Sequence, residues 1–380
     1  MVRISGRRDK PSIFAGAFKF IMKKNRILLV AAALALSNIH LQAAAVPLPI
    51  MGDWQGKWVN TTKASGYMMT HPELCAEVIA LGGDRYRIRF VPQLFKRAHL
   101  FKEIEAAAVD GKIHFDDGSW RGEVAPGALT GEAFYDSKKP VQFSLAKSDF
   151  VSPTMGMSPP DGATVLFDGK NLDAWQMSKG EGKATWPILD HSILEVQPHD
   201  RNADVGGSIR TKEQFGDVYL HLEFKLAYEP QAEGQGRSNS GVFLQSLYEV
   251  QILDSFGMEG TWNECGAIYH TAPPKVNACL PPGEWQTYDI LFRAARFNSD
   301  DSVAEYPRIT VRQNGILVQY NEELPESTFV ASSINASLPV PKFAPIELQD
   351  HNHLVQYRNI WAAPLPDSAE ALIANKKALH

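Results

Sequence analysis

Short runs in which apolar and polar residues alternate, separated by glycine-containing turns, constrain the fold of this chain more than any other feature. From Asp217 to Leu226 apolar residues occupy every second position, which gives an extended strand one apolar and one polar face. Asp110-Gly111 and Asn314-Gly315 separate pairs of such runs, and both are turns that hairpins favour. Long helical patterns are few. The sequence therefore predicts an all-β protein, with a sandwich or jelly roll as its main body.

The 380 residues suggest two all-β domains. The first, 46–149, is a small β domain of unassigned role, with strands expected at 77–81, 86–90, 104–109, 112–115, 129–134 and 141–145. Residues 150–162 are rich in Pro, Ser and Gly without periodicity, which is typical of a linker. The second domain is 163–364, with strands expected at 217–226, 241–245, 248–254, 285–292, 308–313, 316–320, 345–349 and 355–361. Residues 365–380 are expected to form a C-terminal tail.

The N-terminal 45 residues are expected to be a leader and signal peptide. Lys23, Lys24 and Arg26 precede the apolar run 27–36, and small residues up to Ala45 follow it. The run is shorter than the roughly 20 residues of a stable membrane span, although a retained N-terminal anchor is the alternative. We expect cleavage after Ala45, export to the periplasm or the medium, and no stable membrane span afterwards.

Charge and cysteine content narrow the possible partners. The net charge is −5, so the excess of Lys and Arg that nucleic-acid binding needs is missing. Cys265 and Cys279 share one loop-like stretch, which predicts a disulfide in an oxidising compartment, with two buried free thiols as the alternative. Cys75 is left over. The spacing of Cys, His, Asp and Glu favours no metal site, and we expect no cofactor.

The second domain carries a series of short motifs in a fixed order. They are 165–172 (VLFDGKNL) followed by Trp175, 238–245 (SNSGVFLQ), 248–254 (YEVQILD), 264–269 (ECGAIY), 282–286 (PGEWQ), 348–351 (LQDH) and 357–361 (YRNIW). Together, over 163–364, they resemble the 3-keto-disaccharide hydrolase family. The resemblance implies a concanavalin-like jelly roll and the cleavage of 3-keto-glycosides. The chain departs from the family's usual compact turn at Thr261-Trp262-Asn263, within a longer stretch found in one branch of the family.

Carboxylates on the strand 248–254 are the first catalytic candidates. Alternation places Glu249 and Gln251 on one face, and Asp254 joins them if a bulge intervenes. The pattern E-x-Q-x-x-D is similar to the E-x-D-x-x-E strand of laminarinase-type glycosidases, with the middle acid replaced. Glu249 and Asp254 are therefore candidates for acid and base, and hydrogen-bonding residues of a polar face are the alternative.

Two further residues are candidates for proton transfer. Glu264 lies beside Cys265 in a loop, where a carboxylate could equally be a solvated loop acid. His351 follows the strand 345–349 and could act as base or proton donor, or serve as an ordinary turn histidine.

Amides and aromatic residues predict a sugar site, because amides both donate and accept hydrogen bonds while rings cover C–H faces. Beside the aromatic Trp262, the substrate-binding candidates are Asn239, Gln245, Gln251, Tyr269, Asn277, Trp285, Gln349 and Arg358.

Three functions stay open from the sequence. The resemblance implies a glycoside-cleaving hydrolase or lyase, in which Glu249 or His351 removes the C2 proton of a 3-keto-glycoside. The other of these two residues, with Arg358 or Gln349, would polarise the ketone, and Asp254 or Glu264 would protonate the leaving oxygen or activate water. A two-carboxylate hydrolase of ordinary glycosides and a non-catalytic carbohydrate-binding protein are the alternatives. In each case the partner is a sugar or glycoside.

Overall fold

The computed structural model describes residues 48–59, 72–134, 139–179, 182–331 and 338–365. The predicted signal peptide, and all but the first residue of the predicted tail, lie outside these ranges. The described residues confirm the all-β prediction: among them, α3 (Thr328–Ala331) is the one α-helix and η2 (Gly234–Gly236) is a short 3-10 helix. None of these described helices has the length and apolar character needed to cross a membrane.

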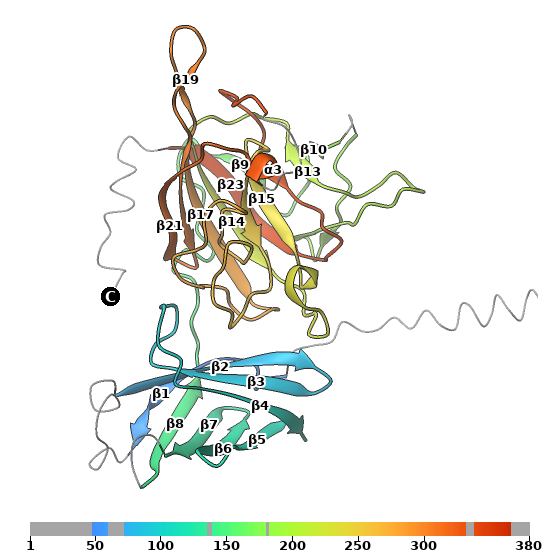
Figure 1. Cartoon of the computed structure of the whole chain (residues 1–380). Coiled ribbons are helices and arrows are strands. Elements are labelled where there is room, and N and C mark those ends of the chain that lie inside the picture. Colours follow the sequence, from blue (N-terminus) through green and yellow to red (C-terminus); the bar gives the residue numbers. More distant parts are fainter. Residues whose placement is uncertain (1–47, 60–71, 135–138, 180–181, 332–337, 366–380) are drawn as a thin grey trace, which may run out of the picture. The chain divides into compact units, whose positions relative to one another are not determined.

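The first domain is a closed barrel of eight antiparallel strands that pair in chain order (Figure 1). The strands are β1 (Gly52–Val59), β2 (Glu73–Gly82), β3 (Arg85–Val91), β4 (Lys102–Val109), β5 (Lys112–Asp116), β6 (Trp120–Ala125), β7 (Ala128–Ala133) and β8 (Val141–Lys147). Aromatic rings fill its interior, and the Phe90 and Trp120 ring centroids lie 4.6 Å apart. Gly122 and Gly131 lie opposite each other, and a Cβ on Gly131 would approach Phe143 Cζ to 2.6 Å. The glycines therefore make room for core rings.

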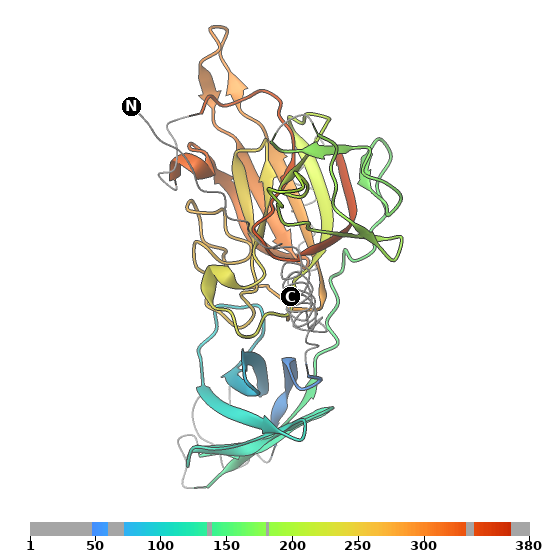
Figure 2. The same cartoon turned by 90° about the vertical axis from the view of Figure 1, so that its right-hand side faces the viewer.

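The second domain is a sandwich of two antiparallel sheets (Figure 2). The smaller sheet has the strand order β10 (Trp175–Met177), β13 (Ile209–Thr211), β22 (Glu347–Leu348), β15 (Ser240–Leu244) and β16 (Tyr248–Ile252). The larger has the order β11 (Ile188–Leu189), β12 (Ile193–Glu195), β23 (Gln356–Pro364), β14 (Val218–Lys225), β17 (Trp285–Arg293), β20 (Arg308–Gln313) and β21 (Ile316–Glu323), with β9 (Thr164–Phe167) beside β23. A separate ribbon joins β18 (Arg296–Phe297) and β19 (Val303–Glu305).

One apolar core fills the space between the two sheets. Val242, Val250 and Leu348 contribute from the smaller sheet, while Leu220 and Tyr288 contribute from the larger one. Because side chains alternate along a strand, the residues between these core positions point away from the sandwich interior. Each sheet therefore has an outward face that a ligand or another segment can cover.

The predicted linker covers part of the outward face of the larger sheet. Thr154 Oγ1 donates to Asp289 Oδ2 at 2.7 Å, and the Gly156 N–H donates to Glu223 Oε1 at 2.6 Å. Beneath it, His221 is fully buried with Nδ1 2.8 Å from Asp289 Oδ1. This segment supplies hydrogen-bond partners to polar groups that would otherwise be buried without them, so the sheet and the segment depend on each other. The domain limits themselves stay predictions.

Candidate active site

The outward face of the smaller sheet is polar. On β16, Val250 points into the core while Glu249 and Gln251 point outward. The strand register sets Glu249 opposite Phe243 and Gln251 opposite Gly241. We call this surface the polar face and define it by Gln176, Arg210, Gly241, Phe243, Glu249, Gln251, Glu347 and Gln349. The alternation predicted from the sequence thus brings two of the expected residues of 248–254 together.

Gly241 provides the floor on which the Glu249 carboxyl lies. A Cβ built on Gly241 would lie 3.0 Å from Glu249 Cδ and closer still to Oε1. Gln251 lies directly opposite Gly241 on one side, and on the other side the Gln349 N–H donates to the Gly241 carbonyl at 2.9 Å. The carboxyl therefore occupies the row that these three residues form across the sheet.

The Gly241→Ala variant should displace this carboxyl. A methyl group at position 241 takes the space that Glu249 Oε1 now occupies, so the side chain must turn away from the row. We expect kcat to fall by about 10²-fold or more, the effect of misplacing a catalytic group by about an ångström, while thermal unfolding changes little. Turnover and melting temperature measured on the same preparation test this. Undiminished turnover would contradict a role in the reaction for the Glu249 carboxyl in this position.

The Glu249 carboxyl is buried, and the described part of the chain provides no partner for it. The residue is 4% exposed, and among the described residues no hydrogen bond or ion pair ends on its carboxyl. Burial, followed by the nearby negative charge of Glu347, raises the pKa of Glu249 to about 8. Burial also raises the pKa of Glu347, against hydrogen bonds from Ser178 and Ser246 and the positive charge of Arg210. A carboxyl that titrates near neutral pH can take or give a proton during a reaction.

The polar face also carries buried polar atoms that lack a partner among the described residues. They are Oε1 of Gln251, Oε1 of Gln349 and Nε of Arg210, and Oε1 of Gln245, which follows β15, is a further one. A buried polar atom that stays unpaired costs about 1–3 kcal/mol, so two acceptors and one donor on this face favour a ligand that supplies the missing groups. A molecule rich in hydroxyl groups does this, because each hydroxyl both donates and accepts.

A network of amides holds Gln251 in place. Gln251 Nε2 donates to Gln235 Oε1 at 3.1 Å and to the Asn263 carbonyl at 3.3 Å. Asn239 Nδ2 also donates to Gln235 Oε1, at 3.1 Å. Because its nitrogen is engaged, the Gln251 side chain presents its oxygen as a fixed acceptor. Asn239, predicted to bind substrate, belongs to the network that holds Gln251.

Aromatic residues continue the polar face beyond β16. The Tyr269 N–H donates to the Glu249 carbonyl at 3.1 Å, and the bridge between Val250 and Ile268 puts this segment beside the strand. Burial raises the pKa of the Tyr269 hydroxyl, with the negative charge of Glu249 as the second cause. The ring of Trp262, which is 44% exposed, lies 5.7 Å from that of Tyr269. Tyr269 therefore adjoins Glu249, and its predicted role in binding substrate stays a prediction.

Asp254 and Glu264 are engaged by their own surroundings. Asp254 Oδ2 accepts from Arg237 Nε and Nη2 at 2.9 and 2.6 Å, so it does not join Glu249 through a bulge. Glu264 Oε2 accepts from the backbone N–H groups of Gly260 and Thr261 at 2.5 and 3.0 Å. Both acids accept hydrogen bonds from their own surroundings and both are buried, so Glu264 is not the solvated loop acid of the alternative.

His351 and Asn277 also lie apart from the carboxyl. His351 is exposed, and its ring stacks on that of His353 with centroids 6.2 Å apart. Asn277 Nδ2 donates to the carbonyls of Ser255 and Met258 at 2.7 and 2.9 Å. Neither residue has a described contact with Glu249 or Gln251.

Arg358 and Trp285 lie on the opposite side of the sandwich. Arg358 Nε donates to Glu223 Oε2 at 2.6 Å, and its guanidinium carbon is 4.0 Å from the Trp285 ring centroid. Glu223 is on the outward face of the larger sheet. Arg358 therefore lies on a different sheet from Glu249, which corrects the expectation that it could polarise a ketone whose C2 proton Glu249 removes.

The predicted disulfide is not formed in the structure. Cys265 and Cys279 are both buried free thiols, as is Cys75. The Tyr288 hydroxyl lies 3.2 Å from Cys265 Sγ, and Gln313 Nε2 donates to the same sulfur at 3.2 Å. Cys279 Sγ donates to the Leu253 carbonyl at 3.5 Å. Hydrogen bonds thus satisfy each sulfur without a bridge, in agreement with the alternative of two buried thiols.

Several residues of the polar face were not predicted as site residues, among them Arg210, Gly241 and Glu347. Arg210 is on a strand of three residues, too short to show a period, and Gly241 has no side chain to suggest a role. Glu347 alternates with Ile346 and Leu348, so its outward direction was readable, but nothing in the sequence pairs it with Glu249. As to metals, no group of three or more His, Cys, Asp or Glu side chains in the described ranges could hold an ion.

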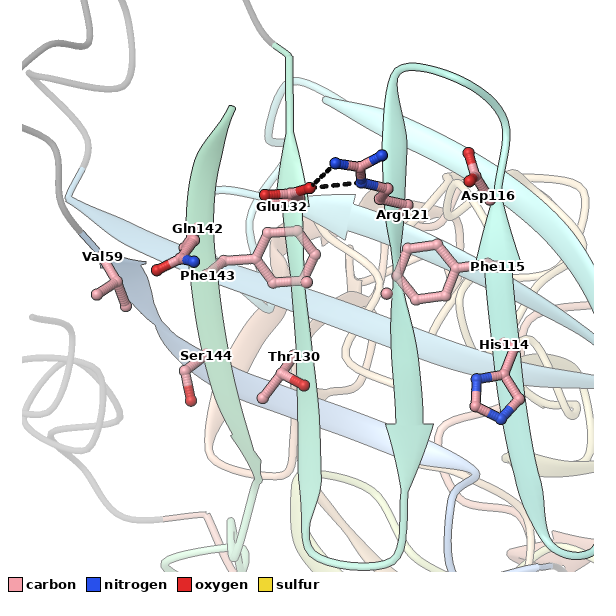
Figure 3. Close-up of a pocket in the computed structure, with 12 residues that line it drawn as sticks. Val59, His114, Phe115, Asp116, Arg121, Thr130, Glu132, Gln142, Phe143 and Ser144 are labelled. Atoms are coloured by element: carbon pink, nitrogen blue, oxygen red, sulfur yellow. Dashed lines mark hydrogen bonds and ion pairs between the residues drawn. The ribbon is translucent and has the colours of Figure 1, made fainter. Parts of the chain in front are cut away.

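A hollow lies on the barrel, where β5 to β8 form one wall (Figure 3). It measures about 810 Å³ and is lined by residues that include His114, Arg121, Thr130 and Glu132. Arg121 and Glu132 are paired with each other. None of the unpartnered buried atoms found among the described residues lines this hollow. The unsatisfied hydrogen-bonding groups therefore favour the polar face of the sandwich as the active site.

Within the described ranges, the smaller sheet buries an unpaired carboxyl on the same face as unpaired amide oxygens, which suits a ligand rich in hydroxyl groups such as a carbohydrate. The chain belongs to the family of 3-keto-alpha-glucoside-1,2-lyase-like domains, whose family model matches residues 162–363. This confirms the resemblance read from the motifs, and with it a carbohydrate-active enzyme whose substrate is a sugar.

Individual proteins similar to this chain were also found. A candidate glycosyl hydrolase from Parabacteroides distasonis is 36% identical, with a TM-score of 0.49, over 55% of this chain and 86% of that one. A second from the same organism is 20% identical, with a TM-score of 0.40, over 54% of this chain and 95% of that one. An argininosuccinate synthase from Ligilactobacillus salivarius is 20% identical over 285 residues, which are 71% of this chain and 68% of that protein. At that identity no activity carries over.

Proposed function

We propose that the polar face cleaves glycosides whose sugar carries a ketone at C3. The observation that supports this is the buried Glu249 carboxyl, which has a pKa of about 8 and no partner among the described residues, on the same face as unpaired amide oxygens. A base with this proton affinity is suited to removing a weakly acidic proton at neutral pH. The ketone makes the neighbouring C2 hydrogen such a proton.

The proposed reaction is an elimination followed by addition of water. Glu249 takes the C2 proton, and the C–H electron pair forms the enolate of the C3 ketone. The enolate then expels the glycosidic oxygen from C1, which leaves as an alcohol after it gains a proton, and an unsaturated keto sugar remains. Water adds to C1 while C2 regains a proton, which gives the free keto sugar.

Arg210 is the proposed stabiliser of the enolate. Its Nε–H is buried, lacks a partner among the described residues and belongs to the same face as Glu249. A charged donor placed where negative charge develops typically contributes about 10²- to 10³-fold. Gln251 and Gln349 would orient the ring by accepting hydrogen bonds from its hydroxyls.

Direct hydrolysis is the second candidate, and Glu347 favours it. Glu347 and Glu249 both lie opposite Phe243, one on each side of β15, so their backbones are about 10 Å apart, the width of two strand spacings. Their carboxyls could flank a glycosidic bond with room for a water, as in inverting glycosidases. This mechanism requires no ketone.

Reaction in heavy water with matched 3-keto and ordinary glycosides separates the two. Elimination should place deuterium at C2 of the released keto sugar and leave the ordinary glycoside uncleaved. Spontaneous exchange is measured without enzyme and with Glu249→Gln. Retention of the original C2 hydrogen, or equal turnover of the ordinary glycoside, would establish direct hydrolysis instead. Binding of both glycosides without turnover would indicate a carbohydrate-binding protein.

The Glu347→Gln variant should shift the pH dependence of turnover. As a base, Glu249 acts only when ionised, so kcat/KM should rise with pH through a midpoint near 8. Removing the negative charge of Glu347 takes away one cause of the raised pKa, which should move this limb to lower pH. Rate profiles from pH 5 to 10 for both proteins measure the shift. A limb that moves to higher pH would exclude Glu249 as the titrating base.

We further propose that the protein is exported to the periplasm or the medium, with Val46 as its first mature residue. The order of basic, apolar and small residues before position 46 supports this. N-terminal sequencing of exported protein is the test, and an intact leader on a membrane-bound product would contradict the proposal.

A further inference from the structure

Phe243 points away from the sandwich core, yet its ring is buried. Its neighbours Val242 and Leu244 belong to the core between the sheets, whereas Phe243 lies on the polar face and is 4% exposed. A ring on an outward face is buried to this extent only if another group covers it. Phe329 of α3 provides cover, because its ring is stacked on that of Phe243 with centroids 5.9 Å apart and 14° between the ring planes. A residue far along the chain therefore closes this part of the polar face.

Thr328, the residue before Phe329, fixes α3 to the strand that carries Glu249. The Thr328 N–H donates to the Leu247 carbonyl at 2.9 Å, and the Thr328 hydroxyl oxygen accepts from the Glu249 N–H at 3.0 Å. β16 is the last strand of the smaller sheet, so its outer backbone groups need partners from outside the sheet. Thr328 supplies two of these partners, which holds the ring of Phe329 over the neighbouring strand β15.

The Phe243 ring is a close neighbour of the Glu249 side chain. Glu249 uses its backbone N–H for Thr328 and its carbonyl for Tyr269, both at the outer edge of β16. Its pairing with Phe243, directly opposite on β15, is therefore of the non-hydrogen-bonded type, in which side chains approach more closely. The Cβ atoms of directly opposite residues are about 4.5–5.5 Å apart. The covered apolar ring thus lies beside the buried carboxyl.

We infer that Phe329 is a positioning residue of the Glu249 site: by covering Phe243, it keeps water away from the carboxyl that takes the proton. This inference rests on the proposed function, in which Glu249 is the base. α3 has the sequence TFVA, so its effect on Glu249 comes from the exclusion of water and not from a charge. The ionisable groups around the carboxyl belong to other elements, and they are Glu347 on β22, Tyr269 beyond β16, Tyr357 on β23 and, beside Glu347, Arg210 on β13.

The Phe329→Ala variant tests this inference through the pH dependence of turnover. Burial is the largest cause of the raised pKa of Glu249, so a carboxyl that gains access to water should ionise at lower pH. We expect the limb of kcat/KM near pH 8 to move down by about one pH unit or more in Phe329→Ala, and by less than about 0.3 unit in Phe329→Leu, which keeps an apolar cover. Tyr320→Ala, which removes an exposed aromatic side chain from β21 of the larger sheet, is the control and should leave the limb unchanged. A limb that stays near 8 in Phe329→Ala, or moves to higher pH, would overturn the inference.

A stability measurement follows the same carboxyl without substrate, and so distinguishes failure of this inference from failure of the proposed function. The wild type and Phe329→Ala are each compared with their own Glu249→Gln counterpart by urea denaturation from about pH 4 to 10. Relative to Gln, Glu249 should become less favourable for folding as the pH rises above its unfolded pKa of about 4.3, and this change should level off at its folded pKa. We expect levelling near pH 8 for the wild-type pair, and about one unit or more lower for the Phe329→Ala pair. That result supports the role of Phe329 even if the heavy-water experiment rejects elimination, whereas levelling at the same pH for both pairs would overturn it whatever the reaction is.

Discussion

Glu249→Gln is expected to lower kcat on a 3-keto-glycoside by about 10²- to 10⁴-fold while KM changes by less than about threefold. Gln has nearly the same shape as Glu but cannot take a proton at any pH used for assay. It keeps the packing over Gly241, so the loss falls on the chemical step rather than on binding. The pH-dependent limb near 8 should disappear together with the activity.

Stability measurements show whether this loss is chemical or structural. The pKa of Glu249 in the folded protein, about 8, is far above the unfolded value of about 4.3. The protonated form therefore stabilises the fold at low pH, and this contribution is lost as the pH rises through about 8. A neutral Gln avoids that loss, so above pH 8 the variant should be at least as stable as the wild type.

The matched control for this variant is Glu322→Gln, a partly exposed acid on β21 that pairs with Lys275. It should retain wild-type turnover, because it lies in the other sheet. Retention of more than a tenth of the wild-type kcat by Glu249→Gln would remove Glu249 from the chemical step and make Glu347 the leading candidate for the base.

The strands could be predicted because their side chains alternate with a period of two. The strand expected at 217–226 is observed as β14, and 308–313 coincides with β20. Between β20 and β21, Asn314 and Gly315 have φ of 54° and 76°, as a two-residue hairpin turn requires. β1 and β6 were missed because Gly56 and Gly122 interrupt their pattern. In the barrel, neighbouring groups occupy the space that a side chain at these positions would need; at Gly122 one of these groups is the Phe115 ring.

The only features of the site that the sequence could predict are those that a single strand determines, such as which side chains share a face. Alternation correctly placed Glu249 and Gln251 on one face, but it gives no information on which sheet a strand joins. Gln349 and Arg358 are nine positions apart and end up in different sheets, because β22 pairs with β15 while β23 pairs with β14. Contacts made by loops, such as that between Arg237 and Asp254, have no period that a sequence could reveal.

Arg237→Ala is expected to lower the free energy of unfolding by about 3–5 kcal/mol, because it leaves a buried carboxylate without its partner. The Asp254 side chain is 1% exposed, and its Oδ2 accepts hydrogen bonds from Nε and Nη2 of Arg237. Urea denaturation followed by fluorescence measures the loss. The double variant Arg237→Met, Asp254→Leu should recover most of it, since two apolar side chains of similar size need no ionic partner.

A substitution of Asp254 itself distinguishes between two roles for this residue. If it only holds its loop, Asp254→Asn should lower stability, while kcat per folded molecule stays within about threefold of the wild type. A catalytic acid would behave in the opposite way: Asp254→Asn would lose about 10²-fold or more in kcat with little loss of unfolding free energy. That second outcome would return Asp254 to the chemical step and require the loop after β16 to move before reaction, because in the structure Arg237 occupies the carboxylate oxygen that would transfer the proton.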